Sequence, residues 1–539
     1  KQKTAYEIRL SLVGSEMCIR DRPVCTECGM RNGVRGVAIV QILGDRVSAK
    51  RRKPPHASDP SRAPHSSFLI PSSSFLVPSP SSPLPLPMST ALHCSPGRKA
   101  ACDHLTAVVS SFPDLPIAGV GADGALDGLD GRDAGLARAI DGAVRRRWMT
   151  LTALLERRLD RPFDSLEPPL QAVLLAGAAQ LLLLERVPDH AIVHESVEWS
   201  KHAMRVGAGR MVNAVLRSLA RHRDEAQVID RRTGPLAANE LPLEDGRLLR
   251  WRSPVFEQDR AMQLAQQTSH APLLVNRWCE LFGDARAENL ALHGIMLAPT
   301  IVTGAIGDDP DLERHSTAGF RVLRPNAAPI SGILARNPQA WVQDPASAAA
   351  VMATAGLALK TIVDCCAGRG TKTRQLLHVH PGAVVIAADP DPVRFAALEQ
   401  AFAREKRAEV VPSSQLPAAV AGRGGADLVL VDVPCSNSGV LARRLEARYR
   451  FTADRLADLV QLQRHIVRQA VPMLTATGRL LYATCSVEPE ENHAQWAWME
   501  SQMGLARDAS EAILPKGAPG DPASRYSDGG AWALFTRRG

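Results

Sequence analysis

The chain has 539 residues, enough for roughly three or four domains, and its 45% hydrophobic content is ample for buried cores. Ten cysteines without regular spacing argue against a disulfide framework and favour a reducing, cytoplasmic setting. The longest apolar stretch, residues 170–184, contains two glutamines and is shorter than a membrane-spanning helix. It predicts a core helix rather than a membrane anchor.

The net charge of +8 is concentrated in a small part of the chain. Residues 1–87 contain thirteen Lys and Arg against six Asp and Glu, which leaves 51 against 50 in residues 88–539. Aromatic residues make up only 4% of the chain. A nonspecific single-strand binder needs a basic groove and stacking platforms, so this class is disfavoured.

Residues 1–87 are predicted to be a spurious or disordered amino-terminal extension. "RLSLVGSEMCIRDR" resembles the translation of a sequencing adapter, and residues 71–87 are rich in proline and serine without periodicity. Met88 follows directly and is the expected natural start. Cys25 and Cys28 have the spacing of one ligand pair of a zinc site. No second Cys or His pair follows nearby, so no metal is predicted.

Residues 88–225 read as consecutive amphipathic helices. Residues 133–159 have apolar residues at helical spacing around a basic run at 145–147, and proline in the first turn opens a helix after Glu167. "GAGRMVNAVLRSLARHR" places Met211, Val215 and Leu219 on one face. Arginines 210, 217 and 221 then lie on the outer face of this helix. They either form a solvated surface or contact nucleic acid.

Two less regular segments follow. Residues 226–254 are polar, contain Pro and Gly, and are predicted to be a linker. Residues 255–345 combine a helical stretch, "VNRWCELFGDARAENLALHG", with short β-rich runs such as "GFRVLRP". Periodicity predicts a small α+β region there and no more.

Residues 346–539 alternate apolar strands with helices. This alternation builds an open, parallel, Rossmann-like α/β sheet that binds ligands at the carboxyl ends of its strands. The predicted helices lie near 371–379, 391–405, 453–474 and 489–502. The predicted strands are "TIVDCC", "AVVIAAD", "AEVV", "DLVLVD", "LLYATC" and "WALFTR".

The first two strands of this region predict a cofactor site. "DCCAGRGTKT" (364–373) places small residues between a strand and a helix, where a ligand can approach the backbone. It matches neither a P-loop nor a dinucleotide fingerprint. Asp389 ends the second strand, where a carboxylate can accept hydrogen bonds from the ribose hydroxyls of an adenosine ligand, although it could equally cap a helix. Together they favour S-adenosylmethionine.

Two cysteines at strand ends suggest the methyl acceptor. Cys435 follows "DLVLVDVP" and Cys485 follows "LLYAT". Carbon 5 of cytosine is a poor nucleophile until a thiolate adds to carbon 6, and cysteine is the natural residue for that step. Either cysteine alone is as easily a small buried hydrophobe. The pair, each at the ligand-binding edge, favours catalysis.

These motifs, in this order, resemble the Sun/Fmu family of bacterial small-subunit ribosomal RNA cytosine-5 methyltransferases, B type. "VPDHAIVHESVEWSKH" and "MVNAVLRSLAR" are similar to the helical NusB-like RNA-binding module. The resemblance covers residues 90–539. In the rest of the chain it rests on "VQDPAS", "DCCAGRGTKT", "DVPCSNSGVLARR", "YATCSVEPEEN" and "DGGAWALF".

The resemblance implies roles for individual residues. Cys485 would be the nucleophile, Cys435 would assist release of the methylated RNA, and Asp432 would hold the cytosine edge near N3. Lys372 would steady Asp432 and the cofactor. The cofactor-binding set would comprise Cys366, Ala367, Gly368, Arg369, Gly370, Thr371, Lys372, Asp389 and Asp432.

The sequence departs from the family at three places. Arg369 replaces proline in the cofactor loop, and Leu445 to Ala447 replace a His-Pro-Asp segment. Pro412, Ser413 and Ser414 stand where an aspartate is expected after the third strand.

Two other readings stay open: a ribosome-assembly factor with impaired catalysis, and a DNA cytosine methyltransferase, whose nucleophile would be Cys435. The expected partner is small-subunit ribosomal RNA before or during assembly. We expect a monomer without metal or membrane attachment.

Overall fold

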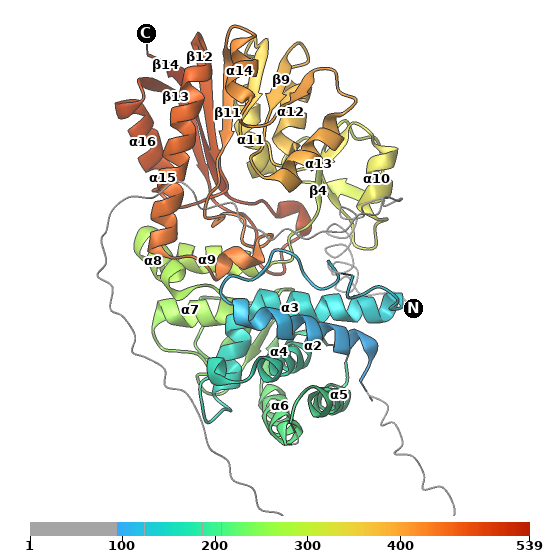
Figure 1. Ribbon diagram of the computed structural model, residues 1–539. Coiled ribbons are helices and arrows are strands. Elements are labelled where there is room, and N and C mark those ends of the chain that lie inside the picture. Colours follow the sequence, from blue (N-terminus) through green and yellow to red (C-terminus); the bar gives the residue numbers. More distant parts are fainter. Residues whose placement is uncertain (1–93, 123, 186, 206, 539) are drawn as a thin grey trace, which may run out of the picture. The chain divides into compact units, whose positions relative to one another are not determined.

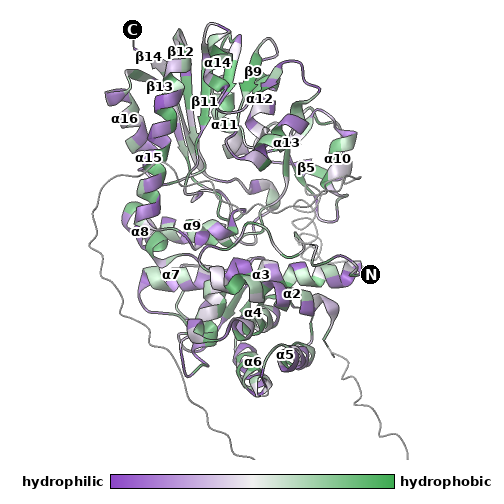
Figure 2. Ribbon diagram, viewed as in Figure 1, coloured by the Kyte–Doolittle hydropathy of each residue, from purple (hydrophilic) through white to green (hydrophobic). Residues whose placement is uncertain are grey.

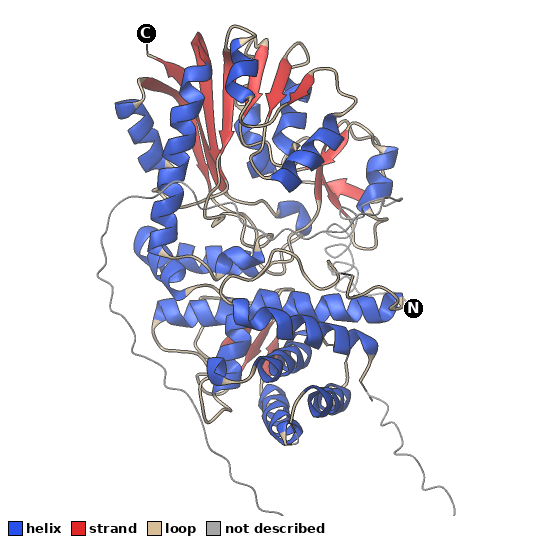
Figure 3. Ribbon diagram, in the orientation of Figure 1, coloured by secondary structure: helices blue, strands red, loops and turns tan. Residues whose placement is uncertain are grey.

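The computed structural model describes residues 94–122, 124–185, 187–205 and 207–538, which all belong to one compact unit. Helices occupy the first part of this unit, and a large sheet flanked by helices occupies the last part (Figures 1 and 3). The expectations for residues 1–87, including Met88 as the start and the Cys25/Cys28 pair, lie outside the described residues. None of the helices within the described ranges is long and apolar enough to cross a membrane.

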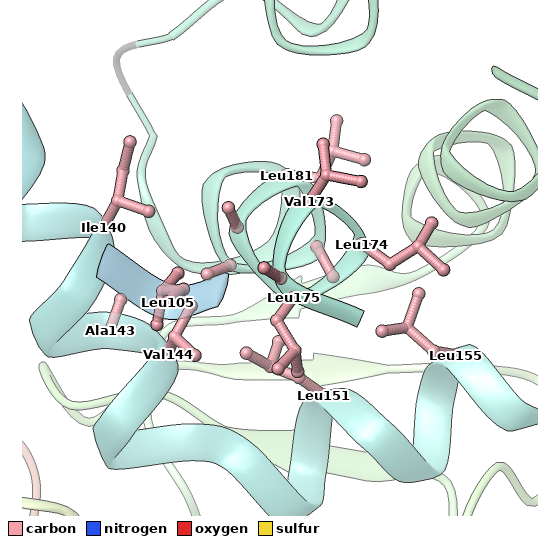
Figure 4. Close-up of a cluster of buried hydrophobic side chains, with 14 of the residues drawn as sticks. Leu105, Ile140, Ala143, Val144, Leu151, Leu155, Val173, Leu174, Leu175 and Leu181 are labelled. Carbon is pink, nitrogen blue, oxygen red and sulfur yellow. The ribbon is translucent and has the colours of Figure 1, made fainter. Parts of the chain in front are cut away.

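The predicted all-helical domain is confirmed. Its core helix α4 is apolar on every side, and accordingly it is buried all round by its neighbours, as the apolar run at 170–184 predicted. Figure 4 shows leucines and valines of α3 and α4 meeting in this core. The helices are α2 (Pro96–Val108), α3 (Gly131–Glu156), α4 (Pro168–Leu183), α5 (Asp189–Ala203) and α6 (Ala208–Asp224).

The basic run 145–147 is buried and belongs to neither a solvated nor a nucleic-acid-facing surface. Arg147 is fully buried and donates from Nη2 to the carbonyl oxygens of Pro242 (2.9 Å) and Gln267 (3.0 Å). Arg146 pairs with Glu244 at 2.8 Å. Buried guanidinium groups need such partners, so Arg146 and Arg147 attach α3 to the segment that follows the helical domain.

Residues 226–254, predicted to be a linker, contain a three-stranded antiparallel sheet in the order β1-β3-β2. Leu241, Leu249 and Trp251 are buried in the same core as the helices. These few apolar residues were obscured by the polar composition around them, and the domain boundaries themselves remain a prediction. The strands are β1 (Gln227–Ile229), β2 (Glu240–Pro242) and β3 (Leu248–Arg250).

The next segment is α+β, as predicted. The single helical stretch of the prediction divides into two helices at Gly283, whose φ of 78° ends α8. A four-stranded antiparallel sheet follows in the order β5-β6-β4-β7. The elements are α7 (Arg260–Thr268), α8 (Pro272–Phe282), α9 (Asp284–Ile295), β4 (Ile301–Gly304), β5 (Leu312–Arg314), β6 (Phe320–Leu323), α10 (Ile330–Arg336) and β7 (Ala340–Val342).

The predicted α/β domain is built on a seven-stranded sheet in the order β10-β9-β8-β11-β12-β14-β13. The first five strands in this order are parallel to one another, as predicted. The strands are β8 (Thr361–Asp364), β9 (Val384–Ala387), β10 (Ala408–Val410), β11 (Ala426–Asp432), β12 (Leu474–Thr484), β13 (Leu505–Ile513) and β14 (Gly530–Arg537).

Two features of this sheet differ from the prediction. Strand β14 runs antiparallel to β12, whereas an all-parallel sheet was expected, and β13 was not predicted at all. Only a short 3-10 helix, and no α-helix, lies between β13 and β14, so the crossover helix that usually connects parallel strands is missing there. Strand β13 is an edge strand with mostly exposed side chains, so it lacks the alternation of apolar residues that indicates a strand.

Helices cover both faces of the sheet (Figure 1). Leu428 and Leu430 of β11 face one helical layer, and Val429 and Val431 face the other. Because both faces are buried, the central strands are continuously apolar (Figure 2). One layer contains α11 (Pro345–Met352), α12 (Thr371–Val379) and α13 (Pro392–Phe402). The other contains α14 (Leu416–Ala421), α15 (Ala453–Ala470) and α16 (His493–Gln502).

The core of the helical domain provides a stability test. Leu151 is fully buried beside Leu175 (Figure 4), so Leu151→Ala should lower the free energy of unfolding by about 2–5 kcal/mol. Leu281→Ala is the control, because this leucine is 43% exposed and should cost less than about 0.5 kcal/mol. Urea unfolding measures both, and equal losses would contradict the packing described here.

Candidate active site

A cavity of about 1000 Å³ lies at the carboxyl ends of the parallel strands. Its volume is at the upper end of the range typical of ligand sites. Loops that follow five strands contribute to its wall, so residues far apart in the sequence share one space. They include Cys366, Gly368 and Lys372 after β8, Asp389 after β9, Ser413 after β10, Asp432 and Cys435 at β11, and Cys485 after β12.

The two cysteines singled out in the sequence are in contact. The Sγ atoms of Cys435 and Cys485 are 2.9 Å apart, and the backbone N–H of Cys485 donates to Sγ of Cys435 at 3.3 Å. Strands β11 and β12 are parallel neighbours, with Asp432 opposite Ala483, so both chains leave the sheet at the same edge. The pairing of these strands therefore produces the thiol pair.

The two thiols have different surroundings. Cys435 is only 8% exposed, whereas Cys485 is half-buried. The hydrogen bond with Cys485, burial and the nearby charge of Glu491 raise the pKa of Cys435 well above its ordinary value. These surroundings therefore favour the protonated form of Cys435.

Asn437 is a third member of this group that the sequence reasoning missed. Its Nδ2 donates to the carbonyl oxygen of Cys435 at 3.0 Å, so its Oδ1 faces Sγ of Cys485 at 3.2 Å. Its φ of 60° lies in the left-handed region, which asparagine tolerates better than most residues. An asparagine two residues after the cysteine was the only available signal.

Asp432 and Lys372 form an ion pair inside the cavity. Nζ of Lys372 is 2.7 Å from Oδ2 of Asp432 and also donates to Oγ of Ser347 at 3.2 Å. Burial acts to lower the pKa of Lys372, but the charge and hydrogen bond of Asp432 outweigh it and raise this pKa above its usual value. Lys372 therefore keeps its charge, and the ion pair holds Asp432 in one orientation.

The loop between β8 and α12 requires its glycines. Gly368 and Gly370 have φ values of 58° and 87°, and a Cβ on Gly370 would collide with the ring of Phe402. Gly368 faces open space, so its backbone is accessible from the cavity. Arg369, which replaces the family's proline, is exposed. The loop can therefore hold a ligand against its backbone.

Asp364 at the end of β8 contains an unpartnered acceptor. The residue is fully buried; its Oδ2 accepts from Oγ1 of Thr373 at 2.7 Å, and its Oδ1 has no partner among the described residues. Burial raises the pKa of Asp364 to about 7, although the hydrogen bond from Thr373 acts to lower it. Sequence reasoning had not singled out this residue.

Asp389 is buried beside the loop, as a cofactor ligand should be, but most of its acceptor capacity is used. Oδ2 accepts from the N–H of Gly368 at 2.9 Å. Oδ1 accepts from the N–H of Asp391 and from Nε of Arg394, both at 2.9 Å. A carboxylate has about four acceptor positions. One position is left, so Asp389 can bind one ribose hydroxyl as arranged, and a second only if Arg394 moves.

The acidic residues after Cys485 are structural supports that the sequence reasoning left unassigned. Glu491 is fully buried and accepts from the N–H and hydroxyl of Ser436 and from Gln463, at 2.5–2.9 Å. Glu488 accepts from Arg277 and from Trp278 of α8. These bonds fix the loops that carry the two cysteines.

Within the described ranges, no group of three or more His, Cys, Asp and Glu side chains could hold a metal ion. The cavity brings together two thiols, an Asp–Lys ion pair and an accessible stretch of loop backbone. Such a set can attack an electron-poor carbon, hold a polar ring edge and bind a small cofactor beside it.

Comparison with known proteins matches both halves of the chain. Residues 355–503 match the family described as 16S rRNA methyltransferase RsmB/F, and residues 98–221 match the NusB family. The Ribosomal RNA small subunit methyltransferase B of Cronobacter sakazakii is 27% identical over 417 residues, which cover 76% of this chain and 91% of that protein. The protein of the same name from Vibrio cholerae is 28% identical over 420 residues, covering 76% and 90%.

A solved structure supports the fold. The crystal structure of PH0851 has a TM-score of 0.57 and 18% sequence identity, and it covers 82% of this chain and 98% of that one. At this identity the likeness concerns the arrangement of the chain only.

The buried carboxyl of Asp364 predicts a pH dependence of stability. Its pKa is about 7 in the folded protein against 3.8 normally, so the folded state holds the proton more tightly. The resulting stabilisation is present below pH 4 and is lost as the pH rises to 7. Asp364→Asn has no such proton, so its free energy of unfolding should rise relative to wild type by up to about 4 kcal/mol across this window. The free energies of unfolding of both proteins are measured in urea at several pH values. If they change with pH in parallel, the effect of burial on Asp364 is contradicted.

Proposed function

We propose that this chain, which belongs to the RsmB/F methyltransferase family and carries a NusB-family domain, methylates carbon 5 of a cytosine in small-subunit ribosomal RNA. S-adenosylmethionine is the proposed methyl donor, and the cytoplasm is the proposed location. The observation that carries the proposal is the contact of two thiols, at 2.9 Å, in one cavity. The same cavity is lined by Asp432, Lys372 and the glycine loop, which is the loop between β8 and α12.

The cofactor would lie along the loop after β8. Gly368 leaves the backbone open to its methionine part. Asp389 would accept one ribose hydroxyl at its remaining position. The cofactor supplies a methyl group bound to a positively charged sulfur, and the residues of the chain do the rest.

The target cytosine would be splayed out of its stack into the cavity. The thiolate of Cys485 adds to carbon 6, and the electron pair of the C5–C6 double bond becomes available at carbon 5 to form the bond to the methyl group. Asp432, held by Lys372 at 2.7 Å, would contact the ring edge near N3 and stabilise the charge that develops there. A water molecule would then accept the proton from carbon 5, the electron pair of that C–H bond re-forms the C5–C6 double bond, and the C6–S bond breaks with its electron pair returning to the sulfur of Cys485.

The surroundings of the thiols support Cys485 as the nucleophile. Burial and its neighbours keep Cys435 protonated, whereas a nucleophile must be a thiolate. Cys485 is also the more exposed of the two and faces the cavity. Cys435, in contact with the sulfur of Cys485, would assist release of the methylated RNA, as the family resemblance implies.

The helical domain would position the RNA. Arg210, Arg217 and Arg221 of α6 are exposed and available for phosphates. The described part of the chain has nearly equal numbers of basic and acidic residues, so this contact would be local. This balance of charge favours docking at a specific site on the RNA over general electrostatic attraction to its phosphates.

The two thiols give the decisive test. Cys485→Ala should abolish both methyl incorporation into unmodified ribosomal RNA and any covalent complex with it. Cys435→Ala should form the covalent bond but release it slowly, leaving a protein–RNA adduct that survives denaturing electrophoresis. The measurement is a gel shift of the full chain with labelled RNA under denaturing conditions.

Other outcomes identify the alternatives. If the adduct is lost in Cys435→Ala but not in Cys485→Ala, the nucleophile is Cys435, as expected for a DNA cytosine methyltransferase. RNA binding by the wild-type chain without any methyl transfer would favour an assembly factor with impaired catalysis. Unchanged turnover in both variants would make the two cysteines packing residues.

A further inference from the structure

An isoleucine of the helical domain is exposed at the opening of the cavity that contains the two cysteines. Ile117 lies in the loop before α3, lines this cavity and is 58% exposed. Single exposed apolar side chains are common on protein surfaces and need no explanation by themselves. The importance of Ile117 therefore depends on how its loop is held and on what reaches this opening.

The helical domain holds this loop by its backbone. Arg145 of α3 is buried, and its Nη2 donates to the carbonyl oxygens of Pro116 and Ile117, the second at 3.3 Å. Asp141 of α3 accepts from the N–H of Val120 at 3.1 Å. These bonds fix the path of the loop and use no atom of the Ile117 side chain, which is left to project into solvent at the cavity.

The same loop is attached to the catalytic domain. The ring of Phe112 packs against that of Tyr449, with centroids 5.2 Å apart, and the buried Tyr449 hydroxyl donates to the carbonyl oxygen of Arg145 at 2.7 Å. Asp114 also pairs with Arg455 of α15 at 2.7 Å, an exposed contact that adds little by itself. The loop is thus anchored on both sides, and Ile117 is held at the cavity before any ligand arrives.

The polar groups at this opening suit a nucleic-acid strand. Arg444 and His465 are exposed and line the cavity, and both side chains can donate hydrogen bonds to phosphate oxygens. The carboxylate of the same segment, Glu446, is buried and is therefore turned away from such a strand. An exposed apolar side chain beside exposed donors matches a nucleotide, which has an apolar base face and an anionic phosphate.

We propose that Ile117 is an apolar wedge for the RNA, which packs against the base next to the target cytosine once that cytosine has entered the cavity. This role rests on the proposed methylation of cytosine in RNA and adds a part for the helical domain in opening the stack. A base that swings out exposes the face of its neighbour to water. Apolar side chains inserted at such a step offset the cost of unstacking.

Single-turnover methyl transfer by the full chain tests the wedge. The substrate is a fragment of unmodified small-subunit ribosomal RNA around the cytosine that wild type methylates. Two further fragments carry an abasic nucleotide on the 5′ or the 3′ side of that cytosine. Ile117→Ala should react about tenfold more slowly with the intact fragment, because unstacking is no longer compensated. With one abasic fragment it should equal wild type, because the base that Ile117 contacts is absent.

Two variants serve as controls. Ile117→Leu keeps an apolar side chain of the same size and should retain most of the wild-type rate. Val228→Ala shortens a side chain that is 55% exposed and does not line the cavity, so it should react as wild type does with all three fragments.

Binding of S-adenosylhomocysteine and urea unfolding separate the wedge from other roles of Ile117. Both should be unchanged in Ile117→Ala, because the side chain is mostly exposed and the proposed contact is with RNA. A wild-type rate on the intact fragment, an equal deficit with all three fragments, weaker cofactor binding or lower stability would each overturn the wedge. Failure of wild type to methylate RNA at all would instead contradict the proposed function, and the wedge with it.

Discussion

The parallel pairing of β11 with β12 is the constraint on which the rest of the site depends. Its register places Val429 opposite Leu480 and Asp432 opposite Ala483, and the chain continues from there into Cys435 and Cys485. Both strands are buried on both faces, and a slip of one residue would turn every side chain to the opposite layer. The hydrophobic core therefore fixes the 2.9 Å contact between the thiols.

The site also depends on how its charges are distributed. Asp432 forms an ion pair with Lys372, whereas burial raises the pKa of Asp364 to about 7 despite the nearby charge of Lys372. Asp389 already binds the glycine loop and Arg394, which fixes the wall of the cavity before any ligand arrives. The three carboxyl groups therefore differ in burial and in their bonding partners, because their surroundings in the fold differ although the residue type is the same.

Much of the fold and of the candidate site could be predicted from the sequence, because the local sequence patterns agree with the overall fold. Glycines and small residues after apolar runs predicted the loop after β8, and the strand ends predicted the thiol pair. The predicted resemblance is confirmed by the family matches over residues 355–503 and 98–221. What failed depended on contacts distant in sequence. The sheet at 227–250, the antiparallel β14 and the burial of Arg147 all result from tertiary packing, and Asn437 and Glu491 act only through folded neighbours. The individual site roles stay predictions.

The most direct test of the account is sequencing of 5-methylcytosine in the ribosomal RNA of the source cell, with and without this gene. The account predicts that one small-subunit cytosine is methylated when the gene is present and unmethylated when it is deleted. Re-expression of the wild-type chain should restore the mark, and re-expression of Cys485→Ala should not. An identical methylation map in both strains would contradict the account.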